Sequence, residues 1–181
     1  MTLILSLQKV ASSMSTHVVI PARYASSRLP GKPLALINGL PMIVHVAELA
    51  SKTSADSVVV AVDDQRVLNA VIAAGHKALM TRIDHPSGSD RVMQVAEEMG
   101  WDDGDIVINI QGDEPLLPPA IVDNLFTAMI ARKDIEMATL AEAIFNSPDF
   151  LDPNVVKVVV GDNSRAINFT RSPTPYPRES M

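Results

Sequence analysis

The chain has 181 residues, 47% of them hydrophobic and 20% charged, a composition that excludes intrinsic disorder and suits one domain with a substantial core. It contains no cysteine, which excludes disulfide scaffolds, thiolate metal sites and cysteine nucleophiles and fits a reducing compartment. The formal net charge of -6 and the 4% of aromatic residues disfavour nucleic acid as a partner. No apolar run approaches the roughly 18 residues needed to span a bilayer, so no membrane partner is expected.

Residues 1–15 are expected to be peripheral to the fold. The apolar patch Leu3–Leu7 is too short for a secretory signal and follows no basic residue. The stretch is rich in serine and free of acidic residues, as transit peptides are, but it has one lysine and no arginine, which weakens that interpretation. A translation start at Met14 is the simpler interpretation. We therefore expect one domain over residues 16–181, in the cytoplasm.

The first strand is expected at Val18–Ile20, ended by Pro21, because proline lacks the amide that a central strand needs. A loop, Arg23–Asn38, follows, and Pro41 suits the start of the first helix. Helices are then expected at about 41–50, 64–74, 89–99 and 118–131, alternating with strands at 58–62, 77–80 and 106–110. This alternation predicts a three-layer, Rossmann-like α/β fold, with a mostly parallel sheet covered by helices on both faces.

The pattern changes after Glu136, where three segments favour strands. They are residues 137–143, 155–160 and 166–170, and a turn at Gly161–Asn163 joins the last two. We expect them to form an antiparallel extension of the fold.

Ligands of parallel sheets bind at the carboxyl ends of the strands, so the loops there should converge on one crevice. The loop after the first strand carries Arg23, Arg28 and Lys32, and no acidic residue precedes Glu48. Guanidinium and ammonium groups bind phosphate oxygens, and Gly31 allows close backbone approach. The loop has neither a Walker A nor a GxGxxG pattern. A nucleotide phosphate site is predicted, and a solvated basic loop is the alternative.

The second polar loop is QGDEP, residues 111–115, directly after a buried strand. A carboxylate in this place is typical of a magnesium ligand beside phosphates, and Asp113 is the candidate, with Glu114 less favoured. An ordinary Gly-Asp turn is the alternative.

The third polar loop runs from Thr81 to Arg91. Arg82 and Arg91 are its cations, and Ser87 or Ser89 is expected to cap the next helix, whose first turn would offer amides to an anion. His85 could be a general base, but a surface histidine with structural hydrogen bonds is favoured.

Two acidic groups are interpreted as structural. One of Asp63 and Asp64 is expected to cap the following helix, and Asp102, Asp103 and Asp105 are expected to form a solvated turn beside Trp101, which should pack over a helix end.

Taken together, the loops resemble the 3-deoxy-manno-octulosonate (KDO) cytidylyltransferases, or CMP-KDO synthetases. The resemblance covers nearly everything from His17 onward, and QGDEP and DH-x-SG-x-DR are more specific to this branch than IPAR-x-x-SSR, which sialic acid enzymes share. The matching segments are IPARYASSRLPGKPL (20–34), MTRIDHPSGSDR (80–91), NIQGDEP (109–115), PNVVKVVV (153–160) and FTRSPTPYPR (169–178).

The resemblance implies a nucleotidyltransferase fold and the transfer of CMP from CTP to KDO, with Mg2+ and release of pyrophosphate, for lipopolysaccharide biosynthesis. It implies catalytic roles for Arg23, Arg28, Lys32 and Asp113, with Asp113 also the metal ligand. The CTP contacts that it implies are Ala22, Arg23, Ser27, Arg28, Lys32, Ser87, Gly88, Ser89 and Gln111. Its KDO contacts would be Arg28, Arg82 and Gln111. It also implies a homodimer and no strong general base.

Members of the family continue past the position of Arg178 with a further strand, a helix and a late aspartate. We therefore expect a fragment of a longer enzyme or an impaired, poorly soluble product, without the second metal carboxylate. Three alternatives remain: a non-catalytic nucleotide-binding module, a related sugar-acid cytidylyltransferase, and a Rossmann dehydrogenase. The last is disfavoured because no glycine fingerprint is present.

Overall fold

The computed structural model describes residues 14–25 and 29–176. The chain divides into two compact units, one up to Glu136 and one from Met137 on. The predicted CTP contacts Ser27 and Arg28 lie outside the described residues. No helix in the described parts is long and apolar enough to cross a membrane.

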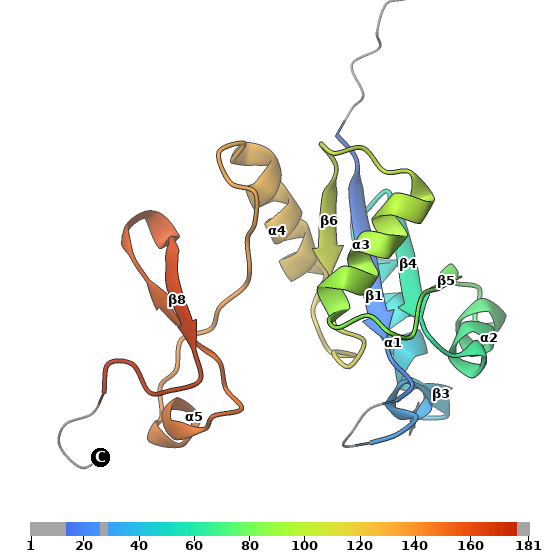
Figure 1. Ribbon diagram of the computed structural model, residues 1–181, viewed down its shortest axis with the longest axis horizontal. Coiled ribbons are helices and arrows are strands. Elements are labelled where there is room, and N and C mark those ends of the chain that lie inside the picture. Colours follow the sequence, from blue (N-terminus) through green and yellow to red (C-terminus); the bar gives the residue numbers. More distant parts are fainter. Residues whose placement is uncertain (1–13, 26–28, 177–181) are drawn as a thin grey trace, which may run out of the picture. The chain divides into compact units, whose positions relative to one another are not determined.

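The first unit is built on a four-stranded sheet in the order β5-β4-β1-β6 (Figure 1). All its pairings are parallel, with Val18 of β1 level with Val58 of β4 and Ile108 of β6. The strands are β1 (Thr16–Ala22), β4 (Ser57–Val62), β5 (Ala78–Met80) and β6 (Ile106–Asn109). The predicted parallel sheet is confirmed. Its first strand in the sequence, β1, lies inside the sheet between β4 and β6.

Helices cover both faces of the sheet because its central strands are apolar on both sides. Val18 and Ile20 of β1 belong to one core cluster, whereas Val19 belongs to another. The first cluster includes buried residues of α1 (Met42–Ala50), α2 (Gln65–Ala73) and α4 (Pro119–Ala131), and the second includes Val95 of α3 (Gly88–Met99). The predicted three layers are confirmed.

Pro21 does not end the first strand, contrary to the prediction. It lies opposite Ala61 of β4, while the pairing of β1 with β6 stops at Val19. The Val19 carbonyl accepts from the Ile110 amide, so the polar groups of Pro21, two residues on, face the same side. Because no ladder continues there, the missing amide of Pro21 costs no hydrogen bond.

The loop predicted at Arg23–Asn38 contains short elements that the sequence analysis missed. They are a 3-10 helix, η1 (Lys32–Leu34), and a hairpin of β2 (Leu36–Ile37) with β3 (Leu40–Pro41). Asn38 and Gly39 join the two strands with positive φ angles of 50° and 85°. Asn-Gly is a strong sequence signal for such a two-residue turn, and it was available in the sequence.

The helix caps agree with the sequence. Asp64 caps α2 by accepting from the Arg66 amide, and Ser87, rather than Ser89, caps α3 in a reciprocal capping box with Asp90. The interpretation of one acidic residue before α2 as a cap is confirmed.

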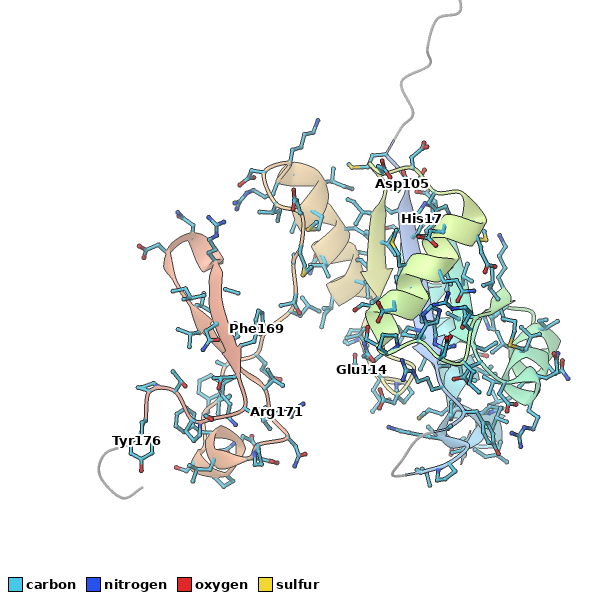
Figure 2. The ribbon with its side chains drawn as sticks, in the orientation of Figure 1. His17, Asp105, Glu114, Phe169, Arg171 and Tyr176 are labelled. Atoms are coloured by element: carbon cyan, nitrogen blue, oxygen red, sulfur yellow. The ribbon has the colours of Figure 1, made fainter. Side chains whose placement is uncertain are left out.

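The prediction that Asp105 lies in a solvated turn is wrong. Its buried carboxylate accepts from the Ser15 amide at 2.8 Å and contacts His17 Nε2 at 3.2 Å. The His17 ring stacks on Trp101 with centroids 3.9 Å apart, so Trp101 covers the start of β1 rather than only a helix end. Figure 2 shows His17 and Asp105 at the opposite end of the sheet from Glu114.

The second unit contains a hairpin of β7 (Lys157–Val160) and β8 (Ala166–Thr170), which confirms the expected antiparallel pair. A short helix, α5 (Ser147–Leu151), precedes it and was not predicted. The strand predicted at residues 137–143 is wrong, since these residues are exposed and form no ladder. Among the described residues, β7 and β8 pair only with each other. Residues 137–143 therefore have no neighbouring strand whose hydrogen bonds would keep them extended.

Candidate active site

A cleft of about 580 Å³ opens where β1 and β6 end. The three loops that the sequence predicted to converge all contribute to its lining, with residues after β1, Gly88 at the start of α3 and residues after β6. The lining residues are Pro21, Ala22, Arg23, Ala25, Leu29, Lys32, Pro33, Met42, Gly88, Gln111, Gly112 and Asp113. The cleft therefore lies at the edge where parallel sheets bind ligands.

Of the residues that the structure describes, two cations line this cleft, one at either end of the first loop. Arg23 follows β1 directly, and one of its terminal nitrogens donates to the His85 carbonyl at 2.7 Å. Lys32 opens η1, and its Nζ lies 2.5 Å from Asp113 Oδ2. The structure thus brings together the two cations and the carboxylate that the sequence singled out.

Asp113 belongs to a loop that approaches β1 very closely. A Cβ atom on Gly112 would lie 2.9 Å from the Pro21 carbonyl oxygen and 3.3 Å from Ile43 Cδ1. Only glycine fits there without displacing backbone, so Gly112 brings Gln111 and Asp113 to the cleft. Glu114, the less favoured metal ligand, is exposed and is absent from the lining.

The third loop reaches the cleft through Gly88, the first residue of α3. The start of a helix carries unpaired amides and a partial positive charge, which favour an anion. Ser87 and Ser89 are exposed and do not line the cleft, and neither does Arg82, which is exposed and pairs with Asp84 at 3.3 Å. These three predicted contacts are therefore not gathered with the others.

His85 is not on the surface, contrary to the prediction. Its side chain is buried, its Nε2 lies 2.5 Å from Gln94 Oε1, and its carbonyl holds Arg23. It does not line the cleft. The predicted structural hydrogen bonds of His85 are therefore present, but they are made by a buried residue and not by a surface one.

Arg91 was predicted as a loop cation, but it is fully buried, with 0% of its side chain exposed. It donates to Asp63 Oδ2 at 3.1 Å and to the Thr81 hydroxyl, while its Nε is buried without a partner among the described atoms. Burial lowers the pKa of Arg91, and the Asp63 carboxylate opposes that effect. This pair ties α3 to the end of β4 and was missed by the sequence analysis.

The apolar wall of the cleft was also missed. Leu29, Pro33 and Met42 supply it beside the cations. The sequence offered only a weak signal, because prolines and a methionine near a polar loop are equally typical of core packing.

Asp113 is the carboxylate that could hold a metal in the cleft, beside the Gln111 amide group. No cluster of three histidine, cysteine, aspartate or glutamate side chains occurs in residues 14–25 and 29–176. A site with one carboxylate suits Mg2+, which completes its shell with phosphate oxygens and water.

Comparisons with known proteins agree with this geometry. A family model described as Cytidylyltransferase matches residues 17–181. The chain is 48% identical over 168 residues to a 3-deoxy-manno-octulosonate cytidylyltransferase of Alcanivorax borkumensis, covering 93% of this chain and 66% of that protein. It is 52% identical over 169 residues to the protein of that name from Pseudomonas fluorescens, again covering 93% and 66%. The chain thus spans slightly less than two thirds of these relatives.

Solved structures give the same result. The structure of CMP:2-keto-3-deoxy-manno-octonic acid synthetase complexed with CTP superposes with a TM-score of 0.84 at 48% identity, over 91% of this chain and 67% of that one. A cytidylyltransferase from Leptospira borgpetersenii superposes with a TM-score of 0.57 at 20% identity, over 67% of this chain and 51% of that one, and supports the fold alone.

Proposed function

The chain belongs to the cytidylyltransferase family, and we propose that it transfers the CMP group of CTP to KDO and releases pyrophosphate. The observation that carries the proposal is the meeting of Arg23, Lys32 and Asp113 in one cleft at the carboxyl ends of the strands. Cations beside a carboxylate, as these three described residues provide, suit a metal-bound triphosphate. The names of the relatives at 48% and 52% identity support KDO as the acceptor.

In the proposed reaction the anomeric hydroxyl oxygen of KDO forms a bond with the α-phosphorus of CTP. The bond from that phosphorus to the bridging oxygen breaks, pyrophosphate leaves with the electron pair, and the hydroxyl proton passes to water. Arg23 and Lys32 hold phosphate oxygens and offset their charge, and the first turn of α3 at Gly88 adds amide donors. Catalysis then depends mainly on positioning and charge stabilisation.

Asp113 is the proposed ligand of Mg2+, because its carboxylate is exposed in the cleft and Mg2+ prefers carboxylate oxygens. When bound, the ion would supply positive charge to the phosphates. Lys32 must leave Asp113 for both residues to act, and a triphosphate offers the lysine a stronger anion.

Ala22, Gly88 and Gln111 line the cleft and are the proposed CTP contacts among the described residues. Arg82 is a proposed contact of the KDO carboxylate from its exposed position outside the lining. In this proposal Ser87 acts as the N-cap of α3 and Ser89 as a residue of its first turn, on either side of Gly88. The proposed reaction belongs in the cytoplasm, where CTP is made, and the dimer implied by the family stays a prediction.

The test is KDO-dependent release of pyrophosphate from CTP and Mg2+ by the purified chain. We expect release with KDO, none when N-acetylneuraminate replaces it, and loss of release in Asp113→Ala. Release with the sialic acid but not with KDO would assign the chain to the related branch. CTP binding without any release would support the non-catalytic nucleotide-binding module instead.

A further inference from the structure

Tyr24 lies between Arg23 and Lys32 in the sequence, and its main chain makes a hydrogen bond beside each of these two cations. Its amide donates to Asp63 Oδ1 at 2.9 Å, directly after Arg23. Its carbonyl accepts from the Gly31 amide at 2.9 Å, directly before Lys32. One residue therefore anchors the chain next to each cation, although its own side chain is absent from the cleft lining.

The ring of Tyr24 adds a steric contact to these bonds. A Cβ atom on Gly31 would lie 3.2 Å from the tyrosine hydroxyl and 3.3 Å from ring carbons, so the Gly31 backbone rests against the ring. Gly31 has a φ of 73°, a left-handed conformation that glycine adopts without strain. The ring therefore lies against the residue that directly precedes η1 and Lys32.

The other face of this arrangement is held by α2. Arg66 Cζ lies 3.7 Å from the centroid of the Tyr24 ring, and Arg66 also donates to the tyrosine hydroxyl at 3.0 Å. The guanidinium is oriented by its ion pair with Asp64 at 2.6 Å, and its side-chain hydrogen bonds lower the pKa of Asp64 to about 2. The ring therefore has a defined position before any ligand binds.

Asp63, which holds the Tyr24 amide, is itself fixed from inside the protein. Its side chain is only 5% exposed, and its second oxygen accepts from the fully buried Arg91. The anchor runs from α3 through Asp63 to the backbone beside Arg23.

From these contacts we propose that Tyr24 is a positioning residue that sets the separation of Arg23 and Lys32 to match a triphosphate. The inference rests on the proposed function for its ligand and extends it by assigning a role to a residue that does not line the cleft. Bonds from the Tyr24 backbone survive substitution of its side chain, whereas the support that the ring gives to Gly31 does not.

The experiment compares Tyr24→Ala with Tyr24→Phe in two measurements. Hydrogen exchange followed by mass spectrometry reports on the amides of residues 31–35, of which Gly31, Lys32, Leu34 and Ala35 are hydrogen-bonded in the structure. Calorimetric titration with CTP and Mg2+ reports affinity. Phe126→Leu, a change in the buried face of α4 outside the cleft lining, is the control for general loss of stability.

We expect Tyr24→Ala to speed exchange at residues 31–35 and to weaken CTP binding about tenfold or more, because misplaced binding groups lose much of their effect. Tyr24→Phe, which keeps the ring, should restore both values to near those of the wild type. Phe126→Leu should lower the melting temperature and leave both unchanged.

Unchanged exchange in Tyr24→Ala would overturn the inference, and so would faster exchange without weaker binding. Equal losses in Phe126→Leu would reduce the role of Tyr24 to general stability and would also overturn it. A wild-type chain that bound no CTP would refute the proposed function by itself. In that case exchange at residues 31–35 would still decide whether Tyr24 orders the lysine end of the loop.

Discussion

Lys32 Nζ and Asp113 Oδ2 lie 2.5 Å apart, so the proposed phosphate ligand and the proposed metal ligand are paired with each other. The side chains are 37% and 48% exposed, respectively, and exposed ion pairs contribute only about 0.2–1 kcal/mol. A metal-bound triphosphate can therefore separate them at small cost.

The first prediction concerns Asp113→Asn. Without Mg2+ this variant should bind CTP about two- to fivefold more tightly than the wild type, because Lys32 no longer has a competing carboxylate. Added Mg2+ should strengthen CTP binding in the wild type and have little effect in the variant. Calorimetric titration with and without Mg2+ measures both values. An equal strengthening by Mg2+ in the two proteins would contradict the assignment of Asp113 as the metal ligand.

The close approach of Gly112 to β1 leads to the second prediction. Gly112→Ala should lower the free energy of unfolding by about 1–3 kcal/mol, because the new Cβ would meet the Pro21 carbonyl at 2.9 Å. The matched control is Gly104→Ala, since a Cβ there meets nothing within 4 Å. Denaturant unfolding compares the two variants, and equal stabilities would argue against the tight contact of the QGDEP loop with β1.

The third prediction concerns which of the two substrates, KDO or CTP, Arg82 contacts. Arg82 is exposed and lies outside the lining of the cleft, so Arg82→Ala should raise KM for KDO and leave the affinity for CTP near its wild-type value. A steady-state series in KDO with a parallel CTP titration gives the two numbers. Weaker CTP binding with an unchanged KM for KDO would move Arg82 to the nucleotide.

The buried carboxylate of Asp105 predicts a pH dependence of stability. Its hydrogen bonds, first those of the Ser15 amide, lower the pKa of Asp105 below the ordinary value. The stabilisation is therefore fully present above the pKa of the unfolded chain, near 4, and is lost as pH falls through the lower folded pKa. Asp105→Asn should cost about 1–3 kcal/mol at pH 7, because an asparagine amide has one accepting oxygen where the carboxylate has two, and the Ser15 and Asp102 amides donate to different carboxylate oxygens.

The difference between the wild type and Asp105→Asn should shrink as the pH falls below about 4, because the carboxyl of the unfolded wild type is protonated first and that of the folded protein follows at its lower pKa. Thermal unfolding between pH 7 and pH 2 follows it. A difference that stayed constant over this range would show that the charge of Asp105 does not stabilise the fold.

The sequence predicted the parallel sheet and the convergence of its loops because both depend on local patterns. Apolar, mostly β-branched runs such as Val58–Val62 and the polar segments that follow them are visible in the sequence residue by residue. Arg23, Lys32 and Asp113 were chosen for their chemistry and their places after strands, and the structure gathers them in one cleft.

What the sequence could not predict depends on long-range partners. The sequence indicates a turn at Asp105 because Ser15, which donates to its carboxylate, is far away in the chain. It indicates a loop cation at Arg91 for the same reason, since its partner Asp63 is also distant in the sequence. Segment 137–143 had the composition of a strand but no strand pairs with it among the described residues. Composition reports the propensity for a strand, whereas pairing decides whether one forms.

Binding of CTP through Lys32 is tested most directly by calorimetric titration of CTP with Mg2+ into the wild type, Lys32→Ala and Lys52→Ala. Lys52 is the control, because it is exposed beyond the last residue of α1 while the first residue of that helix, Met42, lines the cleft. We expect saturable binding to the wild type and to Lys52→Ala, and binding about ten- to hundredfold weaker to Lys32→Ala, from the loss of charge-assisted hydrogen bonds. No binding to the wild type, or equal binding to all three proteins, would contradict this expectation.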